Sequence, residues 1–308
     1  MEKKYMLTDE TKVIDGRTLH RIKALKDFGQ VKAGDLGGFI EKEENLSQEG
    51  NAWICDNAKV CDSAVITDDA YVGEKASIYG FAIIEDSSKV EGRAKIYDHV
   101  VIGSAAIIKD NALIKNHAII LGNAQVFGNT CVAGEVRVYG NAKVYGESYV
   151  ADNIIVRGNA EIYDFGRVRH EAIIEGFGKV SQEQIVSYGI TKTDLSKDLV
   201  ASIKVQCNLP VINNKVIAYK LIRPDFTSFY DVNFKYKVGE VAEVDNYELS
   251  NKSCAAGLHF SNLTYWETGI DEDFICLEAE IDLDDVITVQ EGKIRCKRAK
   301  ILRAFKMS

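Results

Sequence analysis

Hydrophobic residues recur at every sixth position between Gly50 and Ser181. The run divides without insertion or deletion into 22 hexads, and the fifth position of each is valine or isoleucine. The third position is alanine in 14 hexads, and the first is glycine or aspartate in 18. An α-helix has no six-residue hydrophobic period, whereas a short strand followed by a corner does. The pattern therefore predicts a mainly β fold, a parallel β-helix whose third and fifth positions point inward.

The first position of each hexad is suited to a corner. Glycine, aspartate and asparagine tolerate the positive φ that a tight turn requires. With three hexads per coil, residues 50–181 would make about seven triangular coils. The open ends of a solenoid expose strand edges and need covering. We expect residues 1–49 to form an N-terminal β cap, in which Asp15-Gly16 marks a hairpin turn.

The six-residue period disappears after Ser181. We expect residues 182–213 to form a bridge containing a helix, with Thr193 or Asp194 as its N-cap. Its apolar residues at helical spacing are Leu195, Leu199 and Ile203. Residues 214–308 have the pattern of an α+β domain, with strands expected in KVIAYKLIR, FKYKVGEV, FICLEAEIDL, DDVITV and KIRCKRAKILRAF.

The outward fourth position differs between the three faces of the predicted solenoid. On the first face it is mostly polar, but on the third face it is aliphatic in six of seven coils. Leaving six such side chains in water would forgo about 1.5–3 kcal/mol each, so a partner should cover them. We expect a homo-oligomer, with the C-terminal domain or bridging helix folding back as the alternative cover. The predicted interface residues are Val65, Ile83, Val101, Ile119, Ile155 and Ile173.

Two histidines occupy the corner beside this aliphatic face. His99, His117 and Glu135 fall at the second position of successive coils, about 5 Å apart along the stack. A neutral imidazole can act as a general base near pH 7, and stacked imidazoles with a carboxylate could bind a metal. Histidine also occurs at corners because it accepts unusual φ. A structural role for the column therefore stays open.

The stretch SCAAGLHFSNLTYW concentrates polar and aromatic side chains in a region expected to be rich in loops. Loops with histidine and aromatic residues are frequent ligand sites. Its candidate ligand-binding residues are His259, Ser261, Tyr265 and Trp266. Cys254 has no second cysteine or histidine at metal-ligand spacing, so we predict no metal site there.

Charge and composition limit the classes of partner that we expect. There are 46 acidic and 38 basic residues, which give a formal net charge of −8. This charge disfavours non-specific binding to nucleic acid or anionic membranes. The first residues do not resemble a signal peptide, and an apolar run long enough to span a membrane is absent from the sequence. We expect a cytoplasmic protein whose seven cysteines are reduced.

The hexads resemble the hexapeptide-repeat family of acyltransferases, as in the spacing of Val60 and Ala64. That resemblance implies a left-handed β-helix, a trimer, and a histidine at the subunit interface acting as general base with acyl-CoA as donor. His117 or His99 would fill this role. The sequence departs from the family because no loop interrupts the hexads and a much larger segment follows them.

A wider resemblance covers nearly the whole chain. The segments GRTLHRIKAL, GDLGGFIEKEENLSQEGNAW, FKYKVGE, CAAGLHFSN and EIDLDDVITVQEGKIRCKRAKIL are similar to uncharacterised hexapeptide-repeat proteins of bacteria and their phages, YdcK-like at the N-terminal part. The C-terminal segment resembles a phage-associated domain of unknown function. This resemblance implies a phage or prophage setting in the host cytosol.

A fainter resemblance concerns ADP-ribosyltransferases. Arg223, the HFS run at 259–261 and the later Glu278 and Glu280 follow the order of arginine, serine and glutamate in those enzymes. There the arginine and serine help to hold NAD, and the last glutamate orients the ribose. Exposed carboxylates that alternate along a strand are also routine, so this order is an alternative and not our first hypothesis.

Our first hypothesis is a non-catalytic binding or interaction protein. An oligomeric β-helix would present its C-terminal domains and bind a nucleotide-like small molecule in clefts between subunits. It needs no cofactor. The alternatives are an acyl-CoA-dependent acyltransferase, an ADP-ribosyltransferase-like domain and a purely structural protein.

Overall fold

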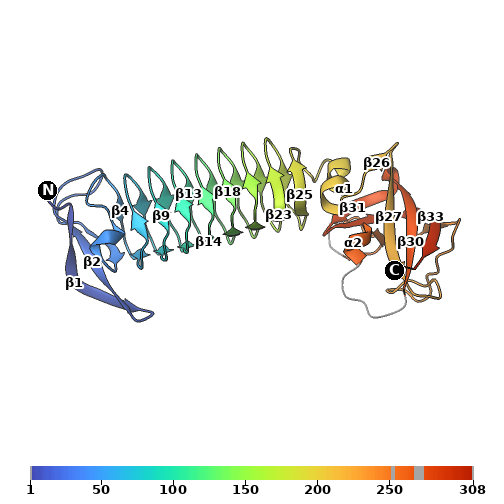
Figure 1. Ribbon diagram of the computed structural model, residues 1–308, viewed down its shortest axis with the longest axis horizontal. Helices are drawn as coiled ribbons and strands as arrows, with labels where there is room; N and C mark the ends of the chain where they lie inside the picture. Colours follow the sequence, from blue (N-terminus) through green and yellow to red (C-terminus); the bar gives the residue numbers. More distant parts are fainter. Residues whose placement is uncertain (1, 251–253, 267–273, 307–308) are drawn as a thin grey trace.

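The computed structural model describes residues 2–250, 254–266 and 274–306. Figure 1 shows a long solenoid with a β-hairpin at its N-terminal end and a compact α+β part beyond its last coil. The predicted mainly β class and the parallel β-helix are confirmed. One face of the solenoid carries a parallel sheet of eight strands, one rung more than the seven coils that we predicted.

The N-terminal cap is built on a hairpin. Strand β1 (Tyr5–Ile14) pairs antiparallel with β2 (Arg17–Ala24), and Asp15 and Gly16 at the turn have φ of 49° and 78°. Strand β3 (Leu36–Ile40) pairs antiparallel with β2 on one side and parallel with the solenoid on the other. The 3₁₀ turn η1 (Glu43–Asn45) follows. Parallel pairing with the solenoid therefore starts at β3, upstream of the first hexad, and β3 links the antiparallel cap to the parallel coils.

The solenoid strands occupy positions four and five of the hexads and pair with strands 18 residues away. The first face contains β4 (Trp53–Ile54), β7 (Tyr71–Val72), β10 (Lys89–Val90), β13 (Ile107–Ile108), β16 (Gln125–Val126), β19 (Lys143–Val144), β22 (Glu161–Ile162) and β24 (Lys179–Val180). The second contains β5 (Lys59–Val60), β8 (Ser77–Ile78), β11 (Lys95–Ile96), β14 (Leu113–Asn116), β17 (Cys131–Gly134), β20 (Tyr149–Asp152), β23 (Arg167–Ile174) and β25 (Ile185–Thr191). The third contains β6 (Val65–Ile66), β9 (Ile83–Ile84), β12 (Val101–Ile102), β15 (Ile119–Ile120), β18 (Arg137–Val138), β21 (Ile155–Val156) and the end of β23.

The inward and corner positions behave as the hexad pattern predicts. Every fifth-position valine or isoleucine is 0% exposed, and burying each contributes about 1.5–3 kcal/mol. Every first position from Gly50 to Gly176 has positive φ. Gly92 also needs to lack a side chain, because an added Cβ would lie 2.5 Å from the backbone nitrogen of Asp110 in the next coil.

Aspartate at the first position has a second role that the hexad pattern alone did not predict. Its carboxylate accepts a hydrogen bond from the backbone N–H 18 residues later. Asp98 accepts from Asn116 (3.0 Å), and Asp110 accepts from Gly128 (3.0 Å). Such a bond satisfies a corner N–H that the strand ladders leave out. Aspartate therefore stabilises both the turn and the stacking of the coils.

The solenoid continues beyond the hexad run. Gln182 has a positive φ of 52°, and Gln184 and Val186 are buried as third and fifth positions would be. Thr193 and Asp194 then pair with Lys179 in the ladder. The expected N-cap at Thr193 or Asp194 is therefore wrong.

Helix α1 (Leu199–Cys207) begins after Asp198, whose side chain accepts from the backbone N–H of Ala201 (2.9 Å). The apolar residues that suggested one longer helix divide between two cores. Leu195 packs into the solenoid core, whereas Leu199 and Ile203 pack into the C-terminal core.

The C-terminal part contains two antiparallel sheets. The larger is ordered β26 (Val211–Ile212), β27 (Lys215–Ile222), β30 (Ile275–Asp282), β33 (Arg298–Phe305) and β28 (Val241–Glu243). The smaller is ordered β29 (Leu258–Phe260), β32 (Lys293–Cys296) and β31 (Val286–Gln290). The short helix α2 (Leu263–Trp266) and the 3₁₀ turn η2 (Leu283–Asp285) complete it.

Three details of this part differ from the predictions. The stretch FKYKVGEV is a strand only from Val241 onward, and the last predicted strand is two strands that separate at Lys297. The region expected to be loops contains β29 and α2, while its Ser253 lies outside the described residues. Among the described helices, none is long and apolar enough to cross a membrane.

The aliphatic column on the third face points outward, as predicted. Five of its six members are partly exposed, and Ile83 is 37% exposed. The C-terminal part lies beyond the last coil and not along this face (Figure 1). Within one chain, the alternative in which that part folds back over the column is therefore wrong.

Candidate functional site

The histidine column on the solenoid is a stack of exposed rings. The imidazole of His99 lies parallel to the ring of Phe81 and to the imidazole of His117, with centroid distances of 4.8 and 5.1 Å. Glu135 is exposed one coil further along. The carboxylate of Asp98, next to His99, accepts instead from the backbone and the side chain of Asn116. No described carboxylate is hydrogen-bonded to either imidazole, so nothing in the described chain selects the tautomer that a general base needs.

The metal alternative for this column finds no support in the geometry. Among the described residues, the one group of potential ligands that converges is Glu41, Cys61 and Asp62, and it includes neither histidine. Its carboxylates are already engaged: Glu41 accepts from the backbone N–H of Asp62 (2.6 Å), and Asp62 pairs with Arg17 (2.8 Å). These partners account for the cluster as a structural contact.

A cavity lined by predicted ligand-binding residues lies in the C-terminal part. It has a volume of about 530 Å³, which is within the range of small-molecule sites. Strands β27, β29 and β32 and helix α2 supply its inner side chains, and the segments 228–236 and 243–246 supply the remaining wall. Three predicted ligand-binding residues line it: His259, Tyr265 and Trp266.

A lysine that the sequence analysis did not single out lies at the base of this cavity. In β27 the buried side chains alternate through Val216, Ala218, Lys220 and Ile222, so Lys220 occupies a position that normally holds an apolar residue. Its side chain is 4% exposed, and its Nζ donates to the carbonyl of His259 (3.3 Å). Burial, with a smaller effect from the charge of Lys293, lowers the pKa of Lys220 to about 8. A lysine in phase with the inward residues of a strand was the available sequence signal.

His259 lies beside this amine. Its Nε2 is buried and has no hydrogen-bond partner among the described residues. Burial, followed by the charges of Lys220, Lys293 and Arg295, lowers the pKa of His259 to about 4. The imidazole is therefore neutral near pH 7 and has an unoccupied ring nitrogen. Buried polar atoms without a partner are uncommon and often mark functional positions.

The second cavity lysine comes from β32. The side chain of Lys293 is 11% exposed, and its Nζ lies 3.2 Å from the Sγ of Cys254 and 3.8 Å from a carboxylate oxygen of Glu291. Aromatic rings stand nearby: Tyr265 and Trp266 contact edge to face, with centroids 5.0 Å apart. The indole of Trp266 is held by a hydrogen bond from its Nε1 to the carbonyl of Tyr219 (2.9 Å).

The cavity has its basic side chains inside and its acidic side chains at the rim. Lys220 is buried and Lys293 is half-buried, whereas the acidic residues Asp231, Glu243 and Asp245 are exposed at the rim. Glu243 also lies 4.0 Å from Arg298, outside the cavity. The inner part thus offers cationic or amine nitrogens next to aromatic surfaces.

Gly257 makes the close packing beneath this cavity possible. It has a φ of 146°, and an added Cβ would lie 2.8 Å from the Cγ of the buried Arg295. Strand β29 can therefore approach β32 only with glycine at this position.

The other predicted ligand-binding residues are placed elsewhere. Ser261 is fully buried and donates to the carbonyl of Gly292, and Arg223 donates to the carbonyls of Ser228 and Phe229. Glu280 pairs with Lys215 (2.7 Å) beside a different hollow. Arg223, Ser261 and Glu280 are therefore not among the residues that line the 530 Å³ cavity.

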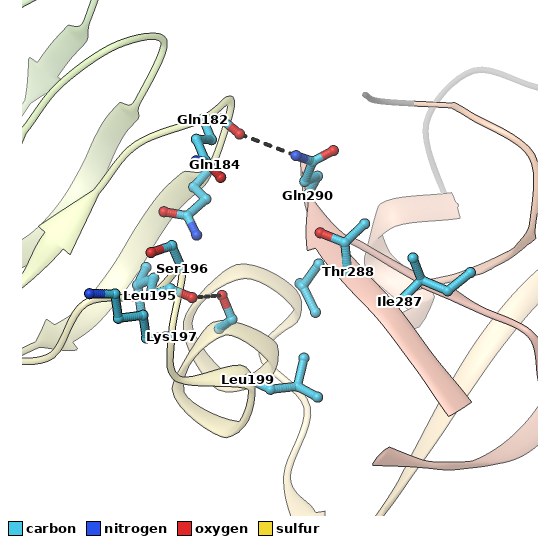
Figure 2. A pocket seen from close by; sticks show the side chains of 11 residues that line it. Gln182, Gln184, Leu195, Ser196, Lys197, Leu199, Ile287, Thr288 and Gln290 are labelled. Carbon is cyan, nitrogen blue, oxygen red and sulfur yellow. Dashed lines mark hydrogen bonds between the residues drawn. The ribbon is translucent and has the colours of Figure 1, made fainter. Parts of the chain in front are cut away.

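A smaller hollow of about 230 Å³ lies where the last coil meets the C-terminal part. Figure 2 shows Gln182 and Gln184 on the solenoid side facing Thr288 and Gln290 on the other. The Nε2 of Gln290 donates to the carbonyl of Gln182 (3.3 Å). The lining is mostly polar, includes Lys197 and lacks the aromatic rings of the larger cavity, so this hollow is a junction between the two parts.

Comparisons with known proteins add one partial similarity. No known family model matches the chain. A segment of 62 residues is 42% identical to an uncharacterised acetyltransferase, YdcK, of Escherichia coli strain K12. The matched segment covers 18% of this chain and 19% of that protein. The similarity and the β-solenoid are consistent with the hexapeptide-repeat proteins at this coarse level.

Proposed function

We propose that this protein binds a small anionic molecule with a planar ring, such as a nucleotide, in the cavity of its C-terminal part. The observation that carries the proposal is the combination of Lys220, Lys293 and His259 with the rings of Tyr265 and Trp266 around one cavity. An ammonium group can pair with a phosphate or carboxylate, and the aromatic rings offer surfaces for a base or similar ring. The ligand would lie within one chain and not in a cleft between subunits.

Calorimetric titration with adenosine 5′-monophosphate and with adenosine tests this function. The monophosphate should bind more tightly than the nucleoside because Lys293 can pair with its phosphate. Lys293→Met should weaken binding of the monophosphate about tenfold to a hundredfold, as expected for a lost charged hydrogen bond, and should leave adenosine binding nearly unchanged. The matched control is Lys237→Met, since Lys237 is exposed and pairs with Glu240 outside the cavity. Equal loss in both variants, or no binding of either ligand, would refute the proposal for nucleotides.

We further propose that the solenoid assembles through its aliphatic third face into a homo-oligomer, with a trimer favoured. The support is the partly exposed column from Val65 to Ile173, which the C-terminal part does not cover. Identical faces can pack around a symmetry axis and bury such columns. Oligomers would present several C-terminal cavities at one end of the rod.

Light scattering on two glutamate variants tests the assembly. Ile119→Glu places a charge in the middle of the aliphatic column and should yield monomers. Ile107→Glu is the matched control, because Ile107 also points outward but lies on the first face between Lys89 and Gln125. A monomeric wild-type protein, or dissociation by both variants alike, contradicts this interface.

Acyl transfer is a second candidate, favoured by the similarity to the YdcK acetyltransferase and by the histidines that border the third face. His117 or His99 would act as the general base, and the partner coil would complete the site. Chromatographic detection of free coenzyme A after incubation with acetyl-CoA and amine or hydroxyl acceptors tests it. Activity lost in His117→Ala or His99→Ala but kept in His20→Ala would support the enzyme. The phage or prophage setting stays a prediction.

A further inference from the structure

The surroundings of Lys220 differ from those of an ordinary buried lysine. An ammonium group has three N–H donors, but Nζ of Lys220 makes one hydrogen bond, to the carbonyl of His259, and no ion pair with a carboxylate among the described residues. The ring of Trp266 lies 5.9 Å from Nζ, and the side chain lines the cavity. A buried charge without a carboxylate is costly, so burial gives Lys220 a larger share of neutral amine than an exposed lysine has.

A neutral amine that opens into a cavity is a nucleophile. Lysines of this kind react with carbonyl compounds to give imines, because the nitrogen lone pair is free and water is largely excluded. The groups that face this amine are Lys293 and Cys296 on β32 and His259 on β29. No described carboxylate faces it.

We propose that Lys220 forms an imine with an anionic aldehyde or ketone bound in this cavity. The lone pair of Nζ attacks the carbonyl carbon, and a proton passes from nitrogen to oxygen to give a carbinolamine. Loss of water from the carbinolamine then forms the C=N bond, with no change in oxidation state. Lys293 would pair with the anionic group of the ligand, and Tyr265 and Trp266 would contact its ring. This inference rests on the proposed binding function and adds the carbonyl to the ligand class.

Pyridoxal 5′-phosphate serves as the probe, because it combines a phosphate, a planar ring and an aldehyde. Its analogue pyridoxine 5′-phosphate has an alcohol in place of the aldehyde, so it can bind but cannot form an imine. After reaction at equimolar concentration, cyanoborohydride reduction and proteolysis, mass spectrometry should locate one adduct per chain, on Lys220. Excess pyridoxine 5′-phosphate should reduce this labelling at least tenfold.

Variants separate reaction from folding and from surface labelling. Lys220→Met and Lys220→Arg should lose the adduct and keep the wild-type circular dichroism spectrum. Lys215→Met should keep it, since Lys215 is exposed on the same strand and pairs with Glu280. The labelling rate at Lys220 should level off above about pH 8, where the buried amine has lost its proton, whereas rates at exposed lysines continue to rise.

The outcomes distinguish the two proposals. Binding of pyridoxine 5′-phosphate without an adduct on Lys220 overturns the imine and supports the binding function. An adduct spread over exposed lysines, unaffected by pyridoxine 5′-phosphate, also overturns the imine. A Lys220 adduct that the analogue suppresses supports both proposals. Failure of both ligands to bind overturns the imine and the binding of anionic aromatic molecules together.

Discussion

The two ends of the solenoid each bury a lysine, and the two amines have opposite surroundings. In the N-terminal cap, Lys4 is 1% exposed, and its Nζ donates to three carbonyl oxygens, of Glu49 (3.0 Å), Gly50 (3.4 Å) and Ala52 (3.1 Å). In the C-terminal part, Lys220 has one carbonyl acceptor and faces a cavity. Burial lowers the pKa of both amines to about 8, but only Lys4 has an acceptor for each of its donors.

The same contrast extends to other buried polar groups. Among the described residues, the buried side-chain atoms without a hydrogen-bond partner include Ser181 Oγ, Thr191 Oγ1, His259 Nε2 and Gln290 Oε1, and none precedes Ser181. Buried groups with full hydrogen bonding stabilise a fold, whereas unsatisfied ones cost stability and are retained where they are used. The buried polar side chains of the N-terminal end are thus satisfied by the fold itself, whereas the C-terminal end retains unsatisfied ones.

Replacing Lys4 or Lys220 with methionine should give the largest difference between the two ends in the free energy of unfolding. Lys4→Met leaves three carbonyl oxygens without a donor and should lower the free energy of unfolding of the cap by about 3 kcal/mol. Lys220→Met replaces a poorly satisfied amine by an apolar chain of similar length and should change stability by less than about 1 kcal/mol, or raise it. Denaturant titration with hydrogen exchange, which resolves the two ends, measures both.

The control for these variants is Lys3→Met. Lys3 forms an exposed ion pair with Glu43, which contributes about 1 kcal/mol at most. If Lys220→Met were as destabilising as Lys4→Met, the contrast between the two ends would be lost, and Lys220 would be a structural residue.

The pH dependence of stability sharpens the comparison. The pKa of Lys220 is about 8 in the fold and about 10.5 when unfolded. Between these values the unfolded chain binds more protons, so the free energy of unfolding should rise with pH, by up to about 3 kcal/mol in all. The C-terminal unfolding transition of Lys220→Met should lack this rise. Denaturation profiles at pH 7.5 and 10 provide the measurement, and identical slopes in the two proteins would argue against a poorly solvated amine.

The smallest expected effect compares two buried threonines in the solenoid. Thr130 and Ser148 lie in successive coils, and their hydroxyl oxygens are 3.1 Å apart. Thr130→Val should cost about 1 kcal/mol because the Ser148 hydroxyl loses its partner. Thr191→Val should be neutral or stabilising because its hydroxyl has no partner among the described residues. Thermal unfolding of the two variants checks the order, and a larger loss for Thr191→Val would show that its hydroxyl is satisfied by water.

The local chemistry of the hexads determines much of the fold. Valine or isoleucine at the fifth position and small or turn-forming residues at the third and first predict the solenoid, its inward positions and its outward columns. The same kind of local argument failed for the helix, because Leu195, Leu199 and Ile203 match a helical period although Leu195 packs into the solenoid. A short run of apolar residues does not say which core each member joins.

The candidate site likewise contains residues that the sequence could predict and residues that it could not. His259, Tyr265 and Trp266 could be proposed as ligand-binding residues from one stretch rich in polar and aromatic side chains, and they line one cavity. Lys220 lies 33 residues before that stretch (253 − 220) and Lys293 lies 27 residues after it (293 − 266). Their convergence depends on the pairing of β29 with β32 and on the packing of β27 beside them. Ser261 and Arg223 were plausible ligand-binding residues by residue type. Their side chains instead donate hydrogen bonds to backbone carbonyls of the surrounding structure.

The sequence by itself determined the repeat, because a period of six is a local property that each hexad expresses through its own corner and strand. It also determined the Asp15-Gly16 hairpin, which needs two residues with positive φ. Only the tertiary structure decided where the solenoid ends, which lysine is buried without a carboxylate and which side chains share a cavity. Those properties depend on contacts between residues far apart in the chain, and burial and hydrogen bonding are set by the whole surroundings of a group.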